Sequence, residues 1–385
     1  MHNNVLYCRP LSHGSKDPSF RLPSKPGKMV TSSVLLTGAN GSLAIPAVHH
    51  LLSTYPNITA ILTVRNPSAS LDHNTRRLQE TIAPFKDRVS IHALDLANLA
   101  VVHDFARSLA SEIASGKIPP LASIICNAFH WNLVGPLQLT SDGYEKTFQV
   151  NHLSHAALIL HLLGSCTSNA RIILFASDAH CPGKNSLEKY PPSLPDVEEQ
   201  KGEGQVDINS LVHLKNTETN EDPLGHGFHR YAVSKLAIIA WMYALNRRLQ
   251  AATRQEEDEE SDNRHVYLKH GITAIAVNPG NLSDSRALRV NTPTSIRIMS
   301  RMIIKPLSPL LRALVDPTMR KASDAGVDVI NLAVGENYSH AEGYFTLRKK
   351  DESSPESMDE KKQELLWRKT LEWTGISAED TVLAL

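Results

Sequence analysis

Short apolar runs alternate with longer helical patterns along most of the chain. Each run has four to seven residues and ends in glycine, proline or polar residues; the runs span residues 34–37, 60–64, 89–94, 121–126, 171–176, 271–277 and 343–347. Helical patterns lie between them, at 45–52, 72–88, 98–115, 142–163, 231–248 and 322–334. Buried parallel strands joined by crossover helices produce this alternation. The pattern therefore predicts an α/β fold in which a single domain contains a doubly wound parallel sheet.

Three stretches depart from this alternation. Residues 181–229 contain many prolines and charges and few apolar residues, which predicts a long polar insertion. Residues 256–262 are mostly acidic and predict a solvated loop. Residues 294–315 mix isoleucine, methionine, leucine and proline with basic side chains. This mixture fits a substrate lid, which the need to cover an apolar pocket favours, or an amphipathic segment that rests on a membrane surface.

The two ends of the chain lie outside the predicted domain, which we place at residues 31–347. Residues 1–30 are polar and lack the apolar core of a secretory signal, so we expect a disordered extension. A misassigned start codon, with Met29 directly before the first run, is equally favoured, and a targeting leader is the alternative. Residues 348–385 are charged and then helical, which predicts a C-terminal helical tail.

The composition argues against several classes of protein. With 385 residues the chain can bury a large core, and its 40 basic residues balance 40 acidic ones. A net charge of zero argues against a protein that binds nucleic acid by neutralising phosphates. The cysteines match neither a disulfide framework nor a zinc site, which predicts a reducing, cytosolic setting and no metal. They are Cys8, Cys126, Cys166 and Cys181. No apolar run approaches the roughly 20 residues that cross a bilayer.

A glycine turn follows the first apolar run and opens a helix. Its small residues are Gly38, Gly41 and Ala44. Small residues let the backbone approach a pyrophosphate, and the helix N-terminus offers unpaired N–H groups and a positive dipole. The strand–turn–helix context therefore favours a dinucleotide site over a plain turn. Arg65 follows the second run, where an acidic residue would favour NAD, so it predicts NADP(H); a solvated surface arginine is the alternative.

Polar residues also stand at the ends of later strands. Asp95 follows the third run, where it can face the adenine edge or cap the next helix. Asn127 follows the fourth run and Ser177 the fifth, at the edge where α/β sheets bind ligands. A serine there can hydrogen-bond a substrate carbonyl. Asn151 lies among apolar residues of a predicted helix, as a structurally satisfied side chain or as the anchor of a proton relay.

Tyr231 and Lys235 lie four residues apart at the start of the predicted 231–248 helix. Residues at this spacing share one helix face, so the phenol and the ammonium would project side by side. The ammonium would stabilise a phenolate and lower the pKa of Tyr231 towards neutrality, as suits a proton donor and acceptor. The spacing also arises by chance, so the pair gains meaning from the nucleotide turn and polar strand ends that precede it.

In this order, the motifs resemble those of the short-chain dehydrogenase/reductase family over about residues 31–347. The matching positions are Thr37-Gly38-x-x-Gly41-x-x-Ala44, Asp95, Asn127-Ala128, Asn151, Ser177, Tyr231-x-x-x-Lys235 and Pro279-Gly280. The resemblance implies a Rossmann-like fold in which Tyr231 is the catalytic acid and Ser177 orients the carbonyl. It also implies that Lys235 binds the nicotinamide ribose and that Asn151 holds a relay water. The cofactor site it implies comprises Thr37, Gly38, Asn40, Gly41, Ser42, Leu43, Arg65, Asp95, Leu96, Asn127, Tyr231, Lys235, Pro279 and Gly280.

The chain departs from the family pattern in several places. Ser42 and Phe129 stand where glycines are usual, and Asp284 stands where a threonine is expected. The interval between Ser177 and Tyr231 far exceeds the short one usual in the family. Long intervals there resemble 3-ketosteroid reductases. The Arg65-Asn66 pair and the tail resemble retinol-dehydrogenase-like members and reductases of fungal secondary metabolism.

We therefore predict an NADPH-dependent oxidoreductase that reduces a ketone or aldehyde, or oxidises the alcohol, on a small apolar substrate such as a steroid, terpenoid or polyketide. We place a substrate lid at 281–320. We expect a cytoplasmic enzyme, with a homodimer implied by the family and peripheral contact of 294–315 with an internal membrane as an alternative. A non-catalytic NADP(H)-binding sensor or scaffold is the competing hypothesis; the departures favour it, whereas the complete catalytic set disfavours it.

Overall fold

A sheet of eight strands forms the centre of the protein, and its strand order is β3-β2-β1-β4-β5-β6-β7-β8. The strands are β1 (Ser32–Leu36), β2 (Ile58–Val64), β3 (Val89–Ala93), β4 (Leu121–Cys126), β5 (Cys166–Phe175), β6 (Thr273–Asn278), β7 (Gly343–Thr346) and β8 (Lys349–Lys350). All neighbours pair in parallel except β7 and β8, which are antiparallel. This arrangement confirms the predicted α/β class and doubly wound parallel sheet.

The computed structural model describes residues 31–68, 70, 72–196, 207–214, 222–258 and 269–385. The predicted extension at 1–30 lies outside these residues, as do parts of the predicted insertion and acidic loop. Within the described ranges, no helix is sufficiently long and apolar to cross a bilayer.

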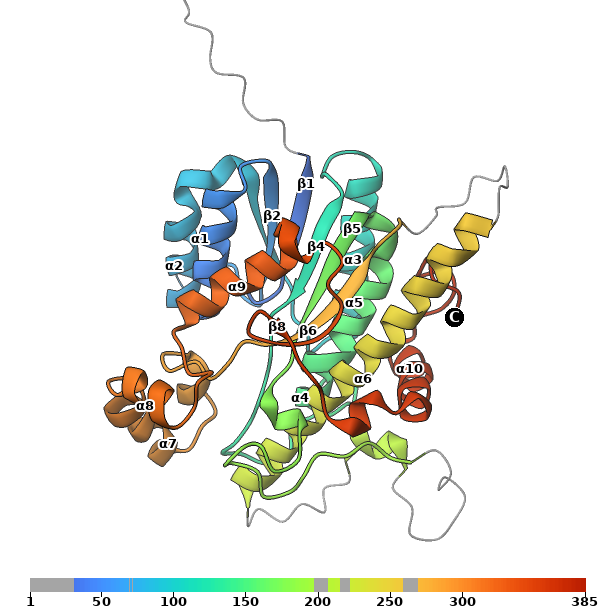
Figure 1. Ribbon diagram of the computed structural model, residues 1–385. Coiled ribbons are helices and arrows are strands. Elements are labelled where there is room, and N and C mark those ends of the chain that lie inside the picture. The colour runs from blue at the N-terminus through green and yellow to red at the C-terminus, as the bar shows by residue number, and fades with distance from the viewer. Residues whose placement is uncertain (1–30, 69, 71, 197–206, 215–221, 259–268) are drawn as a thin grey trace, which may run out of the picture.

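Helices cover both faces of the sheet (Figure 1). One face carries α1 (Ala44–Thr54), α2 (His73–Ile82) and α9 (Ala322–Val334), and the other carries α3 (Leu99–Ala114), α5 (Ser154–Leu162) and α6 (Pro223–Asp258). Side chains of β1 alternate between the two cores: Val34 and Leu36 join the α1 and α9 side, and Leu35 joins the α3 and α5 side. Burial on both faces explains why interior strands such as β2 and β4 are mostly apolar, whereas the edge strand β8, formed by Lys349 and Lys350, is exposed.

The structure places the start of α6 at Pro223, so the predictions that Tyr231 opens this helix and that the insertion runs to residue 229 were wrong. Asp222 caps the helix, because its Oδ1 accepts a hydrogen bond from the Gly225 amide at 3.0 Å. Proline directly after a capping aspartate is typical of a helix start. Phe228 packs into a small apolar cluster, which stabilises the added turns. At its C-terminal end α6 includes residues 256–258, which the sequence predicted to lie in the acidic loop 256–262.

The predicted 142–163 helix is continuous over residues 146–162. It consists of α4 (Lys146–Phe148), a π-helical turn (Gln149–Leu153) and α5. The C-terminal tail contains α10 (Glu360–Thr374), which packs against α6 (Figure 1). Trp367 stacks on Trp241 with ring centroids 5.4 Å apart, and the Arg248 guanidinium lies 4.2 Å from the Trp367 ring centroid. The tail is therefore part of the hydrophobic core on this face.

Candidate active site

The glycine turn is tied closely to the end of β4. Gly38 has φ +64°, and a Cβ on it would lie 2.9 Å from the Cα of Ala128. Asn127 Nδ2 donates hydrogen bonds to the carbonyls of Thr37 (2.9 Å) and Gly38 (3.1 Å). Helix α1 then begins without a side-chain cap and without an acidic residue in its first turn. Within this first turn the Ile45 amide donates to the Gly41 carbonyl at 3.1 Å and Pro46 has no N–H, so the Ala44 amide and the positive end of the helix dipole are what can attract an anion such as a pyrophosphate.

Arg286 joins this turn to the segment that follows β6. Its guanidinium donates to the Asn40 carbonyl at 2.7 Å, and its backbone amide donates to Ser42 Oγ at 3.1 Å. Burial lowers the pKa of Arg286, and the nearby Asp72 carboxylate partly offsets that effect. Ser42, a departure from the family pattern, thus has a structural partner. Sequence reasoning missed Arg286, because nothing in its pattern separates it from the neighbouring arginines at 289, 297 and 301.

Arg65 and Asp95 lie just beyond the carboxyl ends of neighbouring strands, β2 and β3, and both side chains are exposed. Asp95 accepts a hydrogen bond from the Ala97 amide at 3.0 Å, so it caps the turn that follows β3. The next helix, α3, is capped by Asn98, whose Oδ1 accepts from the Val101 amide at 3.1 Å, so the alternative that Asp95 caps this helix was wrong. Burial, reinforced by the charges of Lys146 and Arg65, lowers the pKa of His130 to about 4. His130 is therefore neutral at physiological pH.

Ser177, Tyr231 and Lys235 converge at the carboxyl end of β5. Tyr231 is hydrogen-bonded to Ser177, whose Oγ also donates to Asp178 at 2.9 Å. Lys235 Nζ lies 5.5 Å from the centroid of the Tyr231 ring and donates to the Phe175 carbonyl at 2.7 Å. The helix spacing and the strand end thus place a phenol, an alcohol and an amine side by side, as the sequence pattern predicts.

The pKa values of Tyr231 and Lys235 are shifted in a way that the sequence did not predict. Burial raises the pKa of Tyr231, although the hydrogen bond with Ser177 opposes this effect. Burial also lowers the pKa of Lys235 to about 7. The ammonium is directed to the Phe175 carbonyl, and it does not lower the pKa of Tyr231 as the sequence predicted. In this state the phenol is protonated at neutral pH, which is the form that donates a proton.

The low pKa of Lys235 makes stability depend on pH. The unfolded chain keeps this proton up to about pH 10.5, whereas the folded protein releases it near pH 7. Burying the charged amine therefore destabilises the fold below pH 7, and this penalty disappears as pH rises from 7 to 10.5. We expect Lys235→Met to be more stable than wild type by about 2 kcal/mol at pH 7, and by less at pH 10. Urea unfolding at both pH values measures this difference; a difference independent of pH would contradict it.

Asn151 lies in the π-helical turn and is buried. Its Oδ1 accepts from the His130 amide at 2.7 Å, and its Nδ2 donates to the His130 carbonyl at 3.0 Å and to Ser234 Oγ at 2.9 Å. Ser234 in turn donates to the Tyr231 carbonyl at 2.7 Å. The Asn151 side chain therefore has structural partners and joins the β4 loop to α6. Its role in a proton relay stays a prediction; π-helical turns are common at functional sites.

Aromatic rings from the loop after β4 lie beside Tyr231. Trp131 lies edge-on at 5.5 Å between ring centroids, and Phe129, which is 44% exposed, lies at 6.4 Å. Trp131 Nε1 donates to the Val290 carbonyl at 3.1 Å, and Asn291 Nδ2 donates to the Trp131 carbonyl at 3.1 Å. Phe129, the second departure from the family pattern, thus contributes to an apolar wall beside the phenol.

The turn after β6 is the remaining part of the predicted cofactor site. Gly280, which follows Pro279, has φ +80°, and a Cβ on it would lie 2.4 Å from the Thr318 carbonyl oxygen. Asp284 Oδ1 accepts from the Ala322 amide at 2.8 Å and so fixes the start of α9. The residue in place of the family's threonine therefore has a structural contact.

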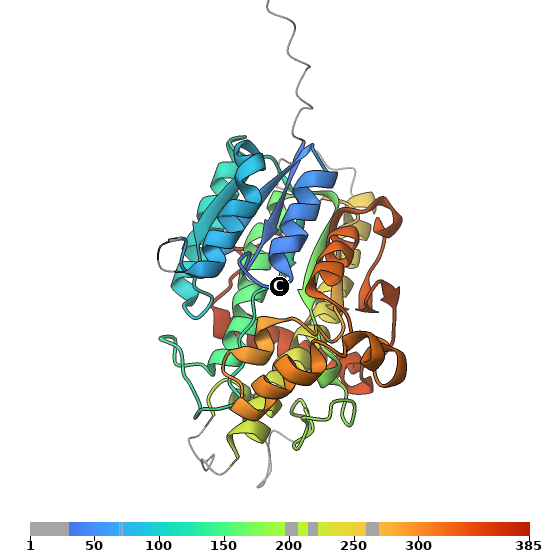
Figure 2. The ribbon, with the colours of Figure 1, turned by 90° about the vertical axis from the view of Figure 1, so that its left-hand side faces the viewer.

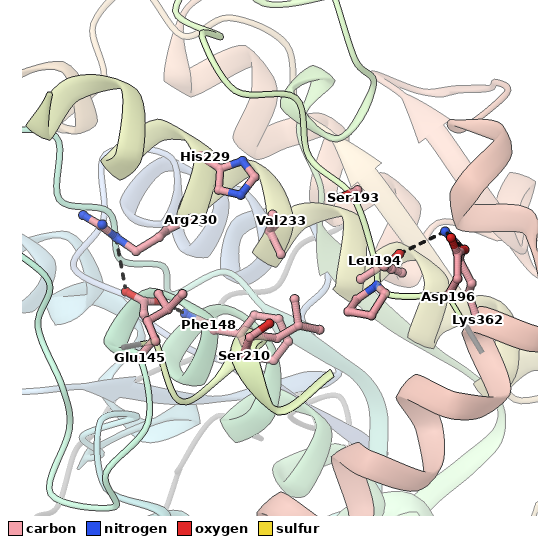
Figure 3. Close-up of a pocket in the computed structure, with 13 residues that line it drawn as sticks. Glu145, Phe148, Ser193, Leu194, Asp196, Ser210, His229, Arg230, Val233 and Lys362 are labelled. Atoms are coloured by element: carbon pink, nitrogen blue, oxygen red, sulfur yellow. Dashed lines mark hydrogen bonds and ion pairs between the residues drawn. The ribbon is translucent and has the colours of Figure 1, made fainter. Parts of the chain in front are cut away.

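A separate cavity of about 370 Å³ lies between α4, α6, α10 and the two loop segments 193–196 and 210–214 (Figure 3). Its charged groups are already paired: Arg230 Nε lies 3.8 Å from Glu145, and Lys362 Nζ lies 2.7 Å from Asp196. His229 and Val233 line it, two positions to either side of Tyr231 on the helix, so it faces away from the phenol. We therefore assign the chemistry to the Tyr231 group and not to this cavity.

Comparisons with known proteins match the chain to dehydrogenases. The AcuH dehydrogenase domain family matches residues 286–383. The dehydrogenase acuH of Aspergillus aculeatus is 51% identical over 94 residues, which cover 24% of this chain and 95% of that protein. The short-chain dehydrogenase iccH of Talaromyces variabilis is 29% identical over 378 residues, 91% of this chain and 98% of that one.

A solved blue fluorescent protein from a metagenomic library, in complex with NADPH, shares the fold with a TM-score of 0.51 and 20% identity. The match covers 82% of this chain and 95% of that chain. The chain belongs to the short-chain dehydrogenase/reductase family, which confirms the resemblance inferred from its motifs.

Proposed function

We propose that the protein is an NADPH-dependent oxidoreductase that interconverts a ketone or aldehyde with the corresponding alcohol on an apolar substrate. The observation that carries this proposal is the convergence of Tyr231, Ser177 and Lys235 at the end of β5. The dinucleotide turn lies at the same edge of the sheet, which is where α/β proteins bind their ligands.

The residues around the turn fit a phosphorylated dinucleotide. The uncapped α1 N-terminus would hold the pyrophosphate, since Gly38 allows close approach of the backbone. Arg65 and Arg286 would hold the 2′-phosphate that distinguishes NADPH from NADH. The NADPH-bound state of the structural neighbour described above is in keeping with this choice. When bound, NADPH supplies the hydride for the carbonyl carbon.

The side chains then supply the proton and the orientation. Tyr231, protonated at neutral pH because burial raises its pKa, would donate its proton to the carbonyl oxygen. Ser177 would hold that oxygen by a hydrogen bond. Lys235 would hold the nicotinamide ribose. Asn151 would anchor the water through which Tyr231 regains a proton.

The aromatic wall supports an apolar substrate. Trp131 and Phe129 present ring edges beside Tyr231, and the segment 281–320, proposed as the lid, is fastened to this wall through Val290. A steroid, terpenoid or polyketide would suit such a surface, and the fungal origin of iccH is in keeping with a role in secondary-metabolite biosynthesis. Three described cysteines are free thiols, which supports the reducing cytoplasm as the place of action.

The choice of NADPH over NADH can be tested at Arg65. We expect Arg65→Glu to weaken NADPH binding about 10- to 100-fold, because a charge-assisted bond to the 2′-phosphate is replaced by repulsion. NADH binding should change by less than about threefold. Fluorescence titration with both cofactors measures the two dissociation constants. Arg107→Glu makes the same charge change at an exposed position on α3 and should alter neither. Equal losses for NADPH and NADH would contradict the assignment of Arg65.

A further inference from the structure

Residues 294–315, named here the α7–α8 arm, project from the body of the protein (Figure 1, Figure 2). The arm comprises α7 (Thr294–Met299), a π-helical turn (Ser300–Ile304) and α8 (Ser308–Leu314). Ile296 and Ser300 are its buried residues. Helices this short are unstable alone in water unless an apolar face is packed against something.

The outward surface of the arm is apolar. Its exposed large apolar residues are Ile298, Met299, Met302, Ile303, Leu307, Leu310, Leu314 and Val315. Three of them are very open, with exposed fractions of 67% for Met302, 74% for Leu314 and 72% for Val315. Isolated exposed apolar residues are ordinary, but a continuous group of this kind marks an interaction surface. Val290 and Asn291 of the proposed lid contact Trp131 of the aromatic wall, whereas these side chains of the arm face solvent.

The charge of the same stretch identifies the partner. Residues 285–315 contain six basic residues and no acidic residue. Four of the basic side chains lie within the arm and are exposed, namely Arg297, Arg301, Lys305 and Arg312. Interleaved basic and apolar side chains suit a bilayer, since the apolar groups enter the acyl boundary while arginine and lysine reach the phosphates.

We propose that the α7–α8 arm docks on the surface of an anionic phospholipid bilayer. The arm follows directly from Val290 and Asn291, which hold Trp131 beside Tyr231. Docking would therefore bring the apolar wall of the active site close to the lipid, where apolar substrates concentrate. The benefit of this proximity for substrate binding rests on the proposed function, whereas the docking of the arm does not.

Sedimentation with vesicles tests the docking on the full-length protein. We expect wild type to bind vesicles of phosphatidylcholine with phosphatidylserine at least tenfold more tightly than pure phosphatidylcholine, and to lose affinity as salt rises. The double variant Arg297→Glu/Arg301→Glu should lose at least tenfold in affinity for the anionic vesicles. Met302→Ser/Leu314→Ser should also lose affinity, even at low salt. Lys86→Glu/Arg107→Glu makes the same net charge change at exposed positions elsewhere and should bind as wild type does.

Three results would overturn the proposal: no binding of wild type to anionic vesicles, arm variants that bind like wild type, or equal losses in the control variant. A protein that light scattering shows to be dimeric, and that becomes monomeric only in the arm variants, would instead assign this surface to a second copy of the chain. Unchanged unfolding temperatures confirm that the variants fold. The Tyr231→Phe variant should bind vesicles like wild type, so failure of docking and failure of the proposed chemistry are separable.

Discussion

Tyr231→Phe is expected to lower the turnover of an apolar ketone with NADPH by about 10³-fold, because the substitution removes the proton donor. NADPH affinity should change by less than about threefold, since the ring remains and Lys235 keeps its bond to the Phe175 carbonyl. Steady-state rates and fluorescence titration measure the two effects separately.

The matched control for this experiment is Tyr243→Phe. Tyr243 lies on the same helix, and its hydroxyl is hydrogen-bonded to Ser353 Oγ at 3.0 Å, far along the helix from the Tyr231 group. Losing that hydroxyl should cost about 1 kcal/mol of stability and leave turnover unchanged. If Tyr231→Phe kept more than about a tenth of the wild-type rate, another group would have to supply the proton, and the assignment of Tyr231 would be wrong.

Gly38→Ala should have the second largest effect, about a 100-fold loss of NADPH affinity. The new Cβ would lie 2.9 Å from the Cα of Ala128, and the positive φ of Gly38 is itself unfavourable for alanine. The turn would have to move away from β4, which would displace the amides that face the pyrophosphate. Calorimetric titration with NADPH measures the loss.

Gly116→Ala separates the steric effect from the backbone effect. Gly116 also has a positive φ, of +76°, but a Cβ on it would meet no atom within 4 Å. We expect it to cost about 1 kcal/mol of stability and to leave NADPH binding unchanged. Equal NADPH affinities for Gly38→Ala and wild type would show that this turn does not hold the cofactor.

Most of the sheet was predictable because its interior strands are buried on both faces. Such strands are mostly apolar runs, and the polar residue that ends a run marks the ligand edge, as Ser177 does for β5. The edge strand β8 consists of Lys349 and Lys350, which are exposed and form no such run, so it was not predicted. The start of α6 was missed because its first turns are polar or glycine-rich, and the Asp222-Pro223 capping signal stood inside a stretch that composition assigned to a loop. The capping residues therefore indicated the true start of the helix, whereas the average polarity of the stretch wrongly indicated a loop.

Long-range contacts account for the other differences. Arg286 acts on the glycine turn 246 residues away in sequence, through its bond to the Asn40 carbonyl, and no local pattern records such a contact. The pKa of Tyr231 follows from burial and from the direction in which Lys235 points, neither of which helix spacing determines. Ser42 and Asp284 departed from the family pattern, and the structure gives each a structural hydrogen bond. Because both side chains have a structural role, their departure from the family pattern is weak support for the hypothesis of a non-catalytic NADP(H)-binding sensor.

The proposed reductase chemistry is best tested by the consumption of NADPH, followed by absorbance, with a panel of apolar ketones and with NADH as the parallel cofactor. We expect ketone-dependent turnover that is faster with NADPH than with NADH and that vanishes in Tyr231→Phe. Tight NADPH binding without turnover across steroids, quinones, retinoids and polyketide-like ketones would instead favour a protein that only senses its cofactor.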